Sequence, residues 1–137
     1  MNIYEKQFKI IESLKAEKNR LTADGKYYYR TLADLEEELK PLLKKNKLTI
    51  IFNDGRFKYD GMEFIKAEAV LIDTSDLDQP TIKATSTSSF NTQTMSPIDQ
   101  SHHNALCALF MLDNTFDDAT EKYIKDLKDI GIPMEVK

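Results

Sequence analysis

A short run of aromatic and basic residues, Lys26-Tyr27-Tyr28-Tyr29-Arg30, has the side chains that bind a single nucleic-acid strand. Aromatic faces that stack on bases contribute about 1–3 kcal/mol per base, and flanking cations hold the phosphate backbone. In an extended strand, alternation points Tyr27 and Tyr29 to one side and Tyr28 to the other. The run predicts a nucleic-acid surface made by Lys26, Tyr27, Tyr29 and Arg30. The alternative is a strand whose alternate tyrosines belong to the core.

Two further groups of polar side chains extend this candidate surface. Lys44 and Lys45 end a helical pattern, where cations also complement the helix dipole, so a solvated helix end is the alternative explanation. Lys66, Lys83 and Thr85 share one sheet face if their strands pair in register, and could there contact phosphates and sugars. A polar sheet side that faces solvent predicts the same pattern.

Adjacent histidines, His102 and His103, are the candidate metal or catalytic pair. Neighbours on a helix point about 100° apart, so they do not readily hold one ion as an i, i+4 pair does. The lone Cys107 supplies no companion cluster and is expected to be a small buried side chain. We therefore expect no metal site. The two imidazoles are assigned to phosphate or base contact, with a plain role at a helix start as the alternative.

Signatures of catalysis are absent from the sequence. The chain has only four glycines, and they form no phosphate-binding loop. No nucleophile stands beside a candidate base. We expect a protein that is not an enzyme and that needs no cofactor.

Charge is unevenly distributed along the 137 residues. The net charge of −4 argues against nucleic-acid binding, because Lys and Arg drive that binding by releasing counterions. Residues 1–48, however, hold 11 of the 19 Lys and Arg and only 8 of the 23 Asp and Glu, which makes this part +3 and the remainder −7. The asymmetry permits a basic binding face. One cysteine and the lack of a signal-peptide pattern predict a cytoplasmic protein.

The hydrophobic pattern predicts a single α+β domain, a three-stranded antiparallel meander flanked by helices. Its expected parts are an N-terminal helix and short aromatic strand in 1–30, a core in 31–115, and a C-terminal helix and tail in 116–137. Helices are expected at 2–20, 32–45, 98–112 and 117–130, and strands at 26–30, 48–52, 62–73 and 81–90, which gives the order α-β-α-β-β-β-α-α.

Two local signals refine this prediction. Pro41 falls inside the second helix and should kink it or end its regular part. The composition of residues 53–56, Asn-Asp-Gly-Arg, predicts a hairpin turn, which leaves only a short return limb at 57–59.

Two stretches of the sequence carry motifs whose order and separation are informative. Residues 24–50 contain a Gly-Lys turn, an aromatic strand, an acidic helix and a Lys-Pro-Leu-Leu-Lys run before the first core strand. Residues 105–118 begin Ala-Leu-Cys-Ala-Leu-Phe-Met-Leu-Asp-Asn, at the end of the helix that follows the sheet. In sequence, order and separation the two blocks resemble the ERF family of phage single-strand DNA-annealing proteins, and the resemblance extends over residues 1–120.

The resemblance implies single-stranded DNA binding and strand annealing in phage recombination or replication, without nucleotide hydrolysis. It also implies an annealing-recombinase-like core, a homo-oligomeric ring or filament, and a place in the host cytoplasm. One segment departs from the family pattern, because the basic helix start is replaced by residues 96–104 and no Lys or Arg occurs in 84–121. The alternative is therefore an acidic protein-interaction module on the same fold. Such a phage regulatory or anti-defence factor would bind a host or phage protein, including a recombination or defence protein.

Overall fold

The computed structural model describes residues 1–90, 95–121, 125 and 131, which group into two compact units. The core unit consists of Met1–Ala16 and Thr31–Asn114, and the tyrosine unit consists of Glu17–Arg30 and Thr115–Lys137. Helices pack on an antiparallel meander in the core unit, so the predicted α+β class is confirmed. That residues 1–137 act as one domain stays a prediction.

Helix α1, Ile3–Ser13, begins at a side-chain cap. Asn2 Oδ1 accepts a hydrogen bond from the backbone N–H of Glu5 at 2.9 Å, which satisfies one of the amides that a helix start leaves free. Ile3 and Ile10 repeat at helical spacing and are fully buried, so this face of α1 belongs to the core.

The end of α1 is set by Glu38, which lies on another helix. Its carboxylate accepts hydrogen bonds from the amides of Lys15 at 2.6 Å and Ala16 at 2.9 Å. These amides are satisfied outside a helix, and Ala16 takes left-handed backbone at φ 49°. The prediction of one helix over 2–20 was therefore wrong beyond Ser13.

Helix α2, Leu32–Lys45, has the bounds that the sequence predicted. Thr31 Oγ1 accepts from the amide of Asp34, and the Asp34 carboxylate accepts from the amide of Thr31, a reciprocal capping box. Pro41 lies inside the helix and does not end it. Proline removes one N–H, and the burial of Leu39 holds this part of the helix against the core.

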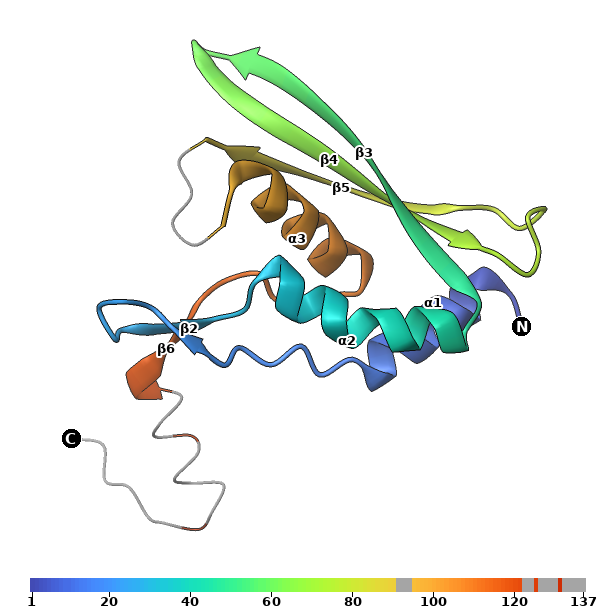
Figure 1. The fold of residues 1–137 in the computed structure, drawn as a ribbon, viewed down its shortest axis with the longest axis horizontal. Helices are drawn as coiled ribbons and strands as arrows, with labels where there is room; N and C mark the ends of the chain where they lie inside the picture. Colours follow the sequence, from blue (N-terminus) through green and yellow to red (C-terminus); the bar gives the residue numbers. More distant parts are fainter. Residues whose placement is uncertain (91–94, 122–124, 126–130, 132–137) are drawn as a thin grey trace. The chain divides into compact units, whose positions relative to one another are not determined.

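A three-stranded antiparallel sheet, ordered β3-β4-β5, forms one layer of the core unit, with α1, α2 and α3 on one side of it (Figure 1). Its strands are β3 at Leu48–Tyr59, β4 at Met62–Asp73 and β5 at Ile82–Ser89. β3 pairs with β4 over its full length, and β5 pairs with β4 on the other side. The predicted meander is confirmed, with β3 longer than expected.

The turn between β3 and β4 lies at Asp60-Gly61 and not at residues 53–56, so that prediction was wrong. Asp60 and Gly61 have φ values of 52° and 75°, the two positive angles of a type I′ turn. Gly55 stays in the strand, opposite Lys66. Both sites read Asp-Gly, but only the later one gives two strands of 12 residues each, so pairing along the whole hairpin selects it.

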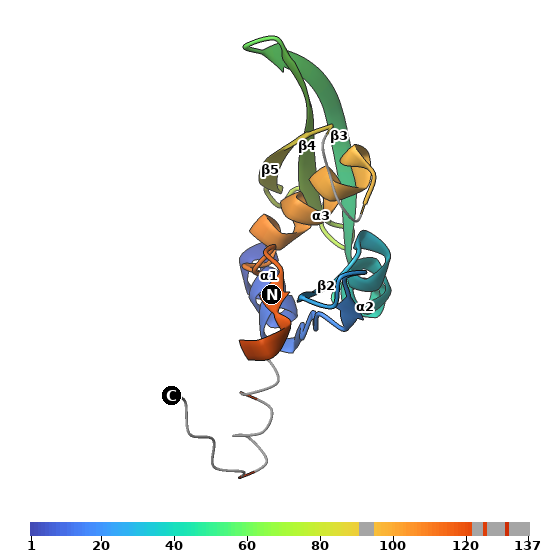
Figure 2. The same ribbon diagram turned by 90° about the vertical axis from the view of Figure 1, so that its left-hand side faces the viewer.

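Helix α3, Pro97–Leu109, lies against one face of the sheet (Figure 2). Ser96 caps it by accepting a hydrogen bond from the amide of Asp99 at 3.2 Å. The buried hydroxyl of Ser101 donates to the carbonyl of Ile65 in β4 at 3.2 Å and ties the helix to the sheet.

α3 ends before the predicted limit of 112 because the backbone reverses at Met111. That residue has a φ of 58°, and the amide of Leu112 bonds to the carbonyl of Cys107 at 2.8 Å. This is a Schellman ending, which usually carries glycine at the left-handed position. A methionine there gives no sequence signal for the helix end.

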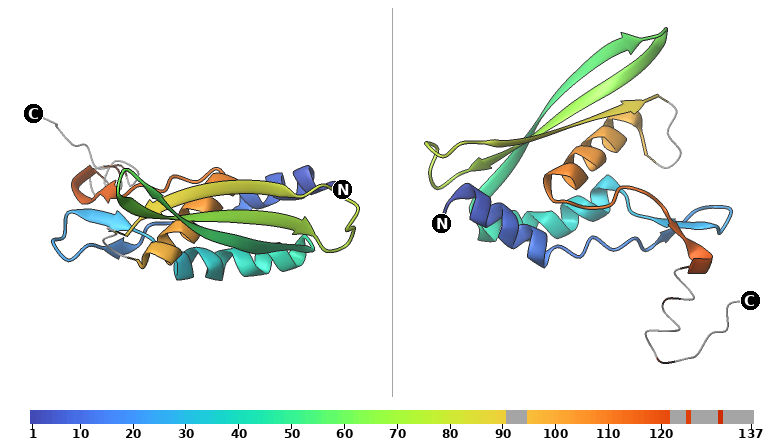
Figure 3. Two further views of the ribbon diagram at one scale, coloured as in Figure 1. Left: turned by 90° about the horizontal axis from the view of Figure 1, so that it is seen from above. Right: turned by 180° about the vertical axis from the view of Figure 1, so that it is seen from behind.

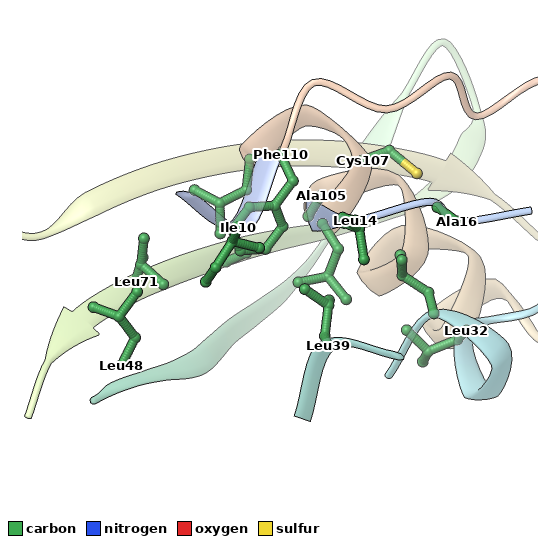
Figure 4. Packing of buried hydrophobic residues seen from close by; sticks show 14 of the residues in the cluster. Ile10, Leu14, Ala16, Leu32, Leu39, Leu48, Leu71, Ala105, Cys107 and Phe110 are labelled. Carbon is green, nitrogen blue, oxygen red and sulfur yellow. The ribbon is translucent and has the colours of Figure 1, made fainter. Parts of the chain in front are cut away.

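The hydrophobic core lies between the sheet and the helices of the core unit (Figure 4). Apolar side chains from α1, α2, β4 and α3 meet there, each at most 2% exposed: Ile10, Leu39, Leu71, Leu106 and Phe110. Full burial of such side chains contributes about 1.5–3 kcal/mol each. This packing covers one face of the sheet with helices.

The tyrosine unit is built on a second small antiparallel sheet, ordered β1-β2-β6. Its strands are β1 at Arg20–Leu21, β2 at Tyr27–Tyr29 and β6 at Asp117–Asp118. β2 was predicted, whereas β1 and β6 were not. The helix expected at 117–130 begins later than predicted, because residues 117–118 form β6. Residues 119–121 and 125 are helical, and residues 122–124 and 126–130 lie outside the described residues.

Candidate nucleic-acid interface

One face of the β3-β4-β5 sheet has no covering helix in the part of the chain that the structure describes. Helices α1, α2 and α3 all lie on the other side (Figures 2 and 3). Along β4, the odd-numbered residues from Ile65 to Leu71 are buried toward the helices, so the even-numbered residues point to the other side. We call this open side, formed by the odd positions of β3 and β5 and the even positions of β4, the outer face.

The strand register brings three sequence-predicted site residues onto the outer face. Lys66 lies opposite Thr87, and Glu68 lies opposite Thr85. Lys83 lies opposite Val70 on the same face. Lys66, Lys83 and Thr85 are all exposed, so the condition on which their grouping depended, in-register pairing, is met.

Exposed aromatic rings occupy the end of the outer face near the hairpin turn, which extends beyond α3 (Figure 1). The rings of Phe57 and Phe64 stack with centroids 5.4 Å apart and an interplanar angle of 17°. Tyr59 and Met62 follow on the same face and are 73% and 55% exposed. Sequence reasoning missed these residues because it placed the turn before them; the alternation of Phe57 and Tyr59 with polar residues was the available signal.

The electrostatic character of the outer face is only weakly positive. Lys66 and Lys83 contribute two cations, and Glu68 contributes one anion between them. The Glu68 carboxylate accepts a hydrogen bond from the Asn53 amide group at 3.2 Å, which partly occupies it. A polyanion on this face would meet two ammonium groups, a row of hydroxyls and aromatic rings.

The predicted tyrosine strand forms β2, in the tyrosine unit. Lys26 is exposed, and the rings of Tyr27 and Tyr29 lie on the same side, 6.4 Å and 5.4 Å from the ring of Phe116. The expected alternation is therefore present, and Phe116 extends the aromatic surface of this strand. Arg30, in contrast, is only 5% exposed and does not lie at the surface.

A family model described as the ERF superfamily matches residues 3–129 of the chain. The chain belongs to the ERF superfamily. The match includes residues of both units, among them β2 and the β3-β4-β5 sheet. Searches of curated proteins and of solved structures gave no match.

The two remaining lysines predicted for the site lie in the last turn of α2 in this ERF-superfamily protein. Lys44 and Lys45 are both exposed. Positive charge in the last turn complements the negative end of the helix dipole. Helix-end solvation and ligand binding both agree with this placement.

The adjacent histidines of the ERF-superfamily protein lie on α3, on the inner side of the sheet. His102 stacks on Phe52 with centroids 3.9 Å apart, and its Nε2 is 2.8 Å from a carboxylate oxygen of Asp54. His103 is buried, with its ring nitrogens 3.8 and 3.9 Å from the sulfur of Cys107, which is itself buried as expected. Neither imidazole lies on the outer face.

Two general features of the described residues bear on the class of site. No group of three or more His, Cys, Asp or Glu in the described chain is arranged to hold a metal ion. No helix in that part of the ERF-superfamily protein is long and apolar enough to cross a membrane. The arrangement that stands out is an open sheet face with cations, hydroxyls and aromatic rings.

Proposed function

We propose that the protein binds single-stranded DNA and anneals complementary strands in phage recombination or replication, with the outer face as its main interface. The observation that carries the proposal is the in-register placement of Lys66, Lys83 and Thr85 on an open sheet face that ends in exposed aromatic rings. Membership of the ERF superfamily supports the same function. Lys26, Tyr27 and Tyr29 of the tyrosine unit, with Lys44 and Lys45 of α2, are proposed as further contacts.

The burial of two predicted site residues revises the proposed interface. Arg30 and His103 are 5% and 2% exposed, so we leave both out of the DNA-contacting set. His102 is engaged with Asp54 and Phe52, and we leave it out as well. Phe57 and Tyr59 take their place, because exposed rings stack on bases without regard to sequence.

The proposed mechanism needs binding and no catalytic step. Ammonium groups and hydroxyls would hold the sugar-phosphate backbone, which leaves base edges free to meet a complementary strand. The free energy of annealing would come from base pairing, so neither nucleotide hydrolysis nor a cofactor is required. The protein would act by concentrating and ordering the strand.

Self-association forms part of the proposal. In the described residues β3 and β5 each pair only with β4, so both edges of the sheet present unpaired backbone groups. Such edges are suited to pair with another copy. Side-by-side contacts of this kind would align successive outer faces in a ring or filament along one strand.

Fluorescence anisotropy with a labelled single-stranded oligonucleotide tests the proposal. We expect binding at low salt that weakens steeply as salt rises, together with faster annealing of two complementary strands. The matched measurement uses a duplex of the same sequence, which should bind more weakly because its bases cannot stack on the rings. Absence of binding to the single strand at low salt would refute the proposed function.

One observation favours the alternative, a protein-interaction module. Met1, Tyr4 and Phe8 recur at helical spacing along one side of α1 and its start, and are 64%, 56% and 57% exposed. Large exposed apolar side chains that share a face are typical of protein contacts. A stable complex with a phage or host protein, lost on Phe8→Ser and unaffected by competing oligonucleotide, would decide for this function.

A further inference from the structure

A lysine-lined hollow lies in the core unit, apart from the residues of the outer face. It has a volume of about 310 Å³ and opens where the start of α1, the link between α2 and β3, and the segment after β4 meet. Its polar lining includes Lys6, Lys9, Lys45, Lys47 and Ser75, and no Asp or Glu lines it among the residues that the structure describes.

The lysines of the hollow differ in how they are paired. Lys6 is buried, and its ammonium group donates to the carboxylate of Asp73 at 2.8 Å and to the hydroxyl of Ser75 at 3.0 Å. Lys9, Lys45 and Lys47 are exposed and have no ion-pair partner among the described residues. Three positive charges around one hollow repel each other, and a bound anion would relieve that repulsion.

The backbone at Lys47, just after the end of α2, is held in one conformation at the edge of the hollow. Its φ of 56° lies in the left-handed region, where glycine or asparagine is the usual residue. The amide and hydroxyl of Thr74 both donate to the carbonyl of Lys47, at 2.9 and 2.8 Å, and hold this conformation. These hydrogen bonds fix the backbone from which the Lys47 side chain extends beside the hollow.

We propose that this hollow binds a phosphate group of single-stranded DNA. Lysines are strong, sequence-independent donors to phosphate oxygens. The volume is at the lower end of the roughly 300–1,000 Å³ of small-ligand sites, so it suits one phosphate with its sugar and excludes a longer stretch of strand. The inference rests on the proposed function, and it adds a discrete phosphate subsite to a binding surface that is otherwise an open sheet.

Titration of the full chain with inorganic phosphate tests the subsite without DNA. We expect saturable backbone amide shifts in the NMR spectrum at residues 9, 45–47 and 75, and much smaller shifts with chloride at the same ionic strength. Two oligonucleotides of the same sequence, one with a 5′-phosphate and one with a 5′-hydroxyl, then show whether the bound phosphate is terminal or internal. Tighter binding of the phosphorylated strand assigns the hollow to a strand end, and equal binding assigns it to an internal phosphate.

A charge-matched pair of triple variants tests the subsite with DNA. The hollow variant is Lys9→Gln with Lys45→Gln and Lys47→Gln, and the control variant changes three exposed lysines that do not line the hollow, Lys15→Gln, Lys40→Gln and Lys58→Gln. The hollow variant should lose affinity by about tenfold or more, and its salt slope should fall by roughly 0.7, the value for one phosphate on a single strand. The control variant should lose much less.

The substitution Lys47→Gly separates ligand binding from folding, because glycine removes the charge and also the backbone strain. We expect weaker DNA binding and an unfolding midpoint that is unchanged or higher. Equal affinity losses in the two triple variants, or no phosphate-dependent shifts in the hollow, would overturn the inference. If the wild-type chain binds no DNA at low salt, the proposed function fails, and the phosphate titration still decides whether the hollow is an anion site.

Discussion

Replacing Lys66 and Lys83 with glutamine removes both cations of the outer face and keeps two long polar side chains. Both residues are exposed strand positions, so the substitutions leave the hydrophobic core untouched. The change in DNA affinity should then come from lost phosphate contacts, because surface substitutions of this kind usually alter stability by less than about 0.5 kcal/mol.

The register of the sheet sets the expected magnitude. Lys83 lies opposite Val70, four residues along β4 from Lys66. At about 3.3 Å per residue along a strand and about 4.8 Å between strands, the Cα atoms of Lys66 and Lys83 are about 14 Å apart. The two ammonium groups should therefore contact different phosphates and count separately. With a salt slope of roughly 0.7 per phosphate on a single strand, the double variant should lose about 1.4 from the slope.

Fluorescence anisotropy with one labelled single strand, measured at several salt concentrations, gives this slope directly. A loss of about 1.4 means that the ratio of wild-type to variant affinity shrinks about sevenfold between roughly 50 and 200 mM salt. The matched control is the double variant Lys15→Gln with Lys58→Gln, which makes the same change in net charge outside the outer face. Its slope should remain close to that of the wild type.

Two results would refute the reasoning. If both double variants lower the slope equally, the strand responds to net charge and not to the outer face. If the Lys66 and Lys83 variant binds as the wild type does at every salt concentration, the outer face does not contact the phosphate backbone.

Three further predictions concern the fold. Gly61→Ala should destabilise the chain by about 1 kcal/mol because Gly61 has a φ of 75°, which a residue with a side chain adopts only under strain. Gly55→Ala should be neutral or slightly stabilising, because Gly55 lies in a strand with open space around it. Urea unfolding measures both changes, and a loss of stability for Gly55→Ala but not for Gly61→Ala would place the turn at residues 53–56. Hydrogen bonds from Lys6 and the neighbouring serine lower the pKa of Asp73 from 3.8 to about 2, so the folded state favours the ionised carboxyl. The free energy of unfolding should therefore fall as pH drops from about 4 to about 2, and Asp73→Asn should flatten this dependence in acid titrations followed by urea unfolding. Leu39→Ala should lower the free energy of unfolding by about 2–5 kcal/mol, because Leu39 is 2% exposed, and an unchanged urea midpoint would contradict the described core.

Elements whose signals are local could be predicted from the sequence. Thr31 and Asp34, three residues apart, carry the sequence signal of a capping box at the start of α2, and alternation of polar and apolar residues indicates β4 at Met62–Asp73. These signals involve residues within one helical turn or one strand of each other, so they predict an element without knowledge of its tertiary contacts.

Elements decided by distant contacts could not be predicted in the same way. The early end of α1 depends on the Glu38 carboxylate, which lies more than 20 residues away. The choice between two Asp-Gly turns depends on pairing along the whole of β3 and β4. β1 and β6 are two residues long and exist because β2 lies between them.

The candidate site shows the same division. Alternation correctly grouped Lys66, Lys83 and Thr85, because the side of a strand is a local property once register is given. The burial of Arg30 and His103 is a tertiary property, and their residue types indicated surface contacts. The lysine-lined hollow joins segments far apart in sequence, and of its lysines only Lys45 was predicted for the site.

The burial of Lys6, Lys18 and Arg30 changes how the molecule would meet a polyanion from a distance. Lys6 forms an ion pair with Asp73, and Lys18 forms one with Asp117, each at 2.8 Å. Residues 1–48 have a net charge of +3, and the same number of their cations, three, is buried. With a net charge of −4, a single copy offers little long-range electrostatic steering toward DNA. Capture would then depend on short-range contacts, and many copies on one strand would gain by avidity what one copy lacks in attraction.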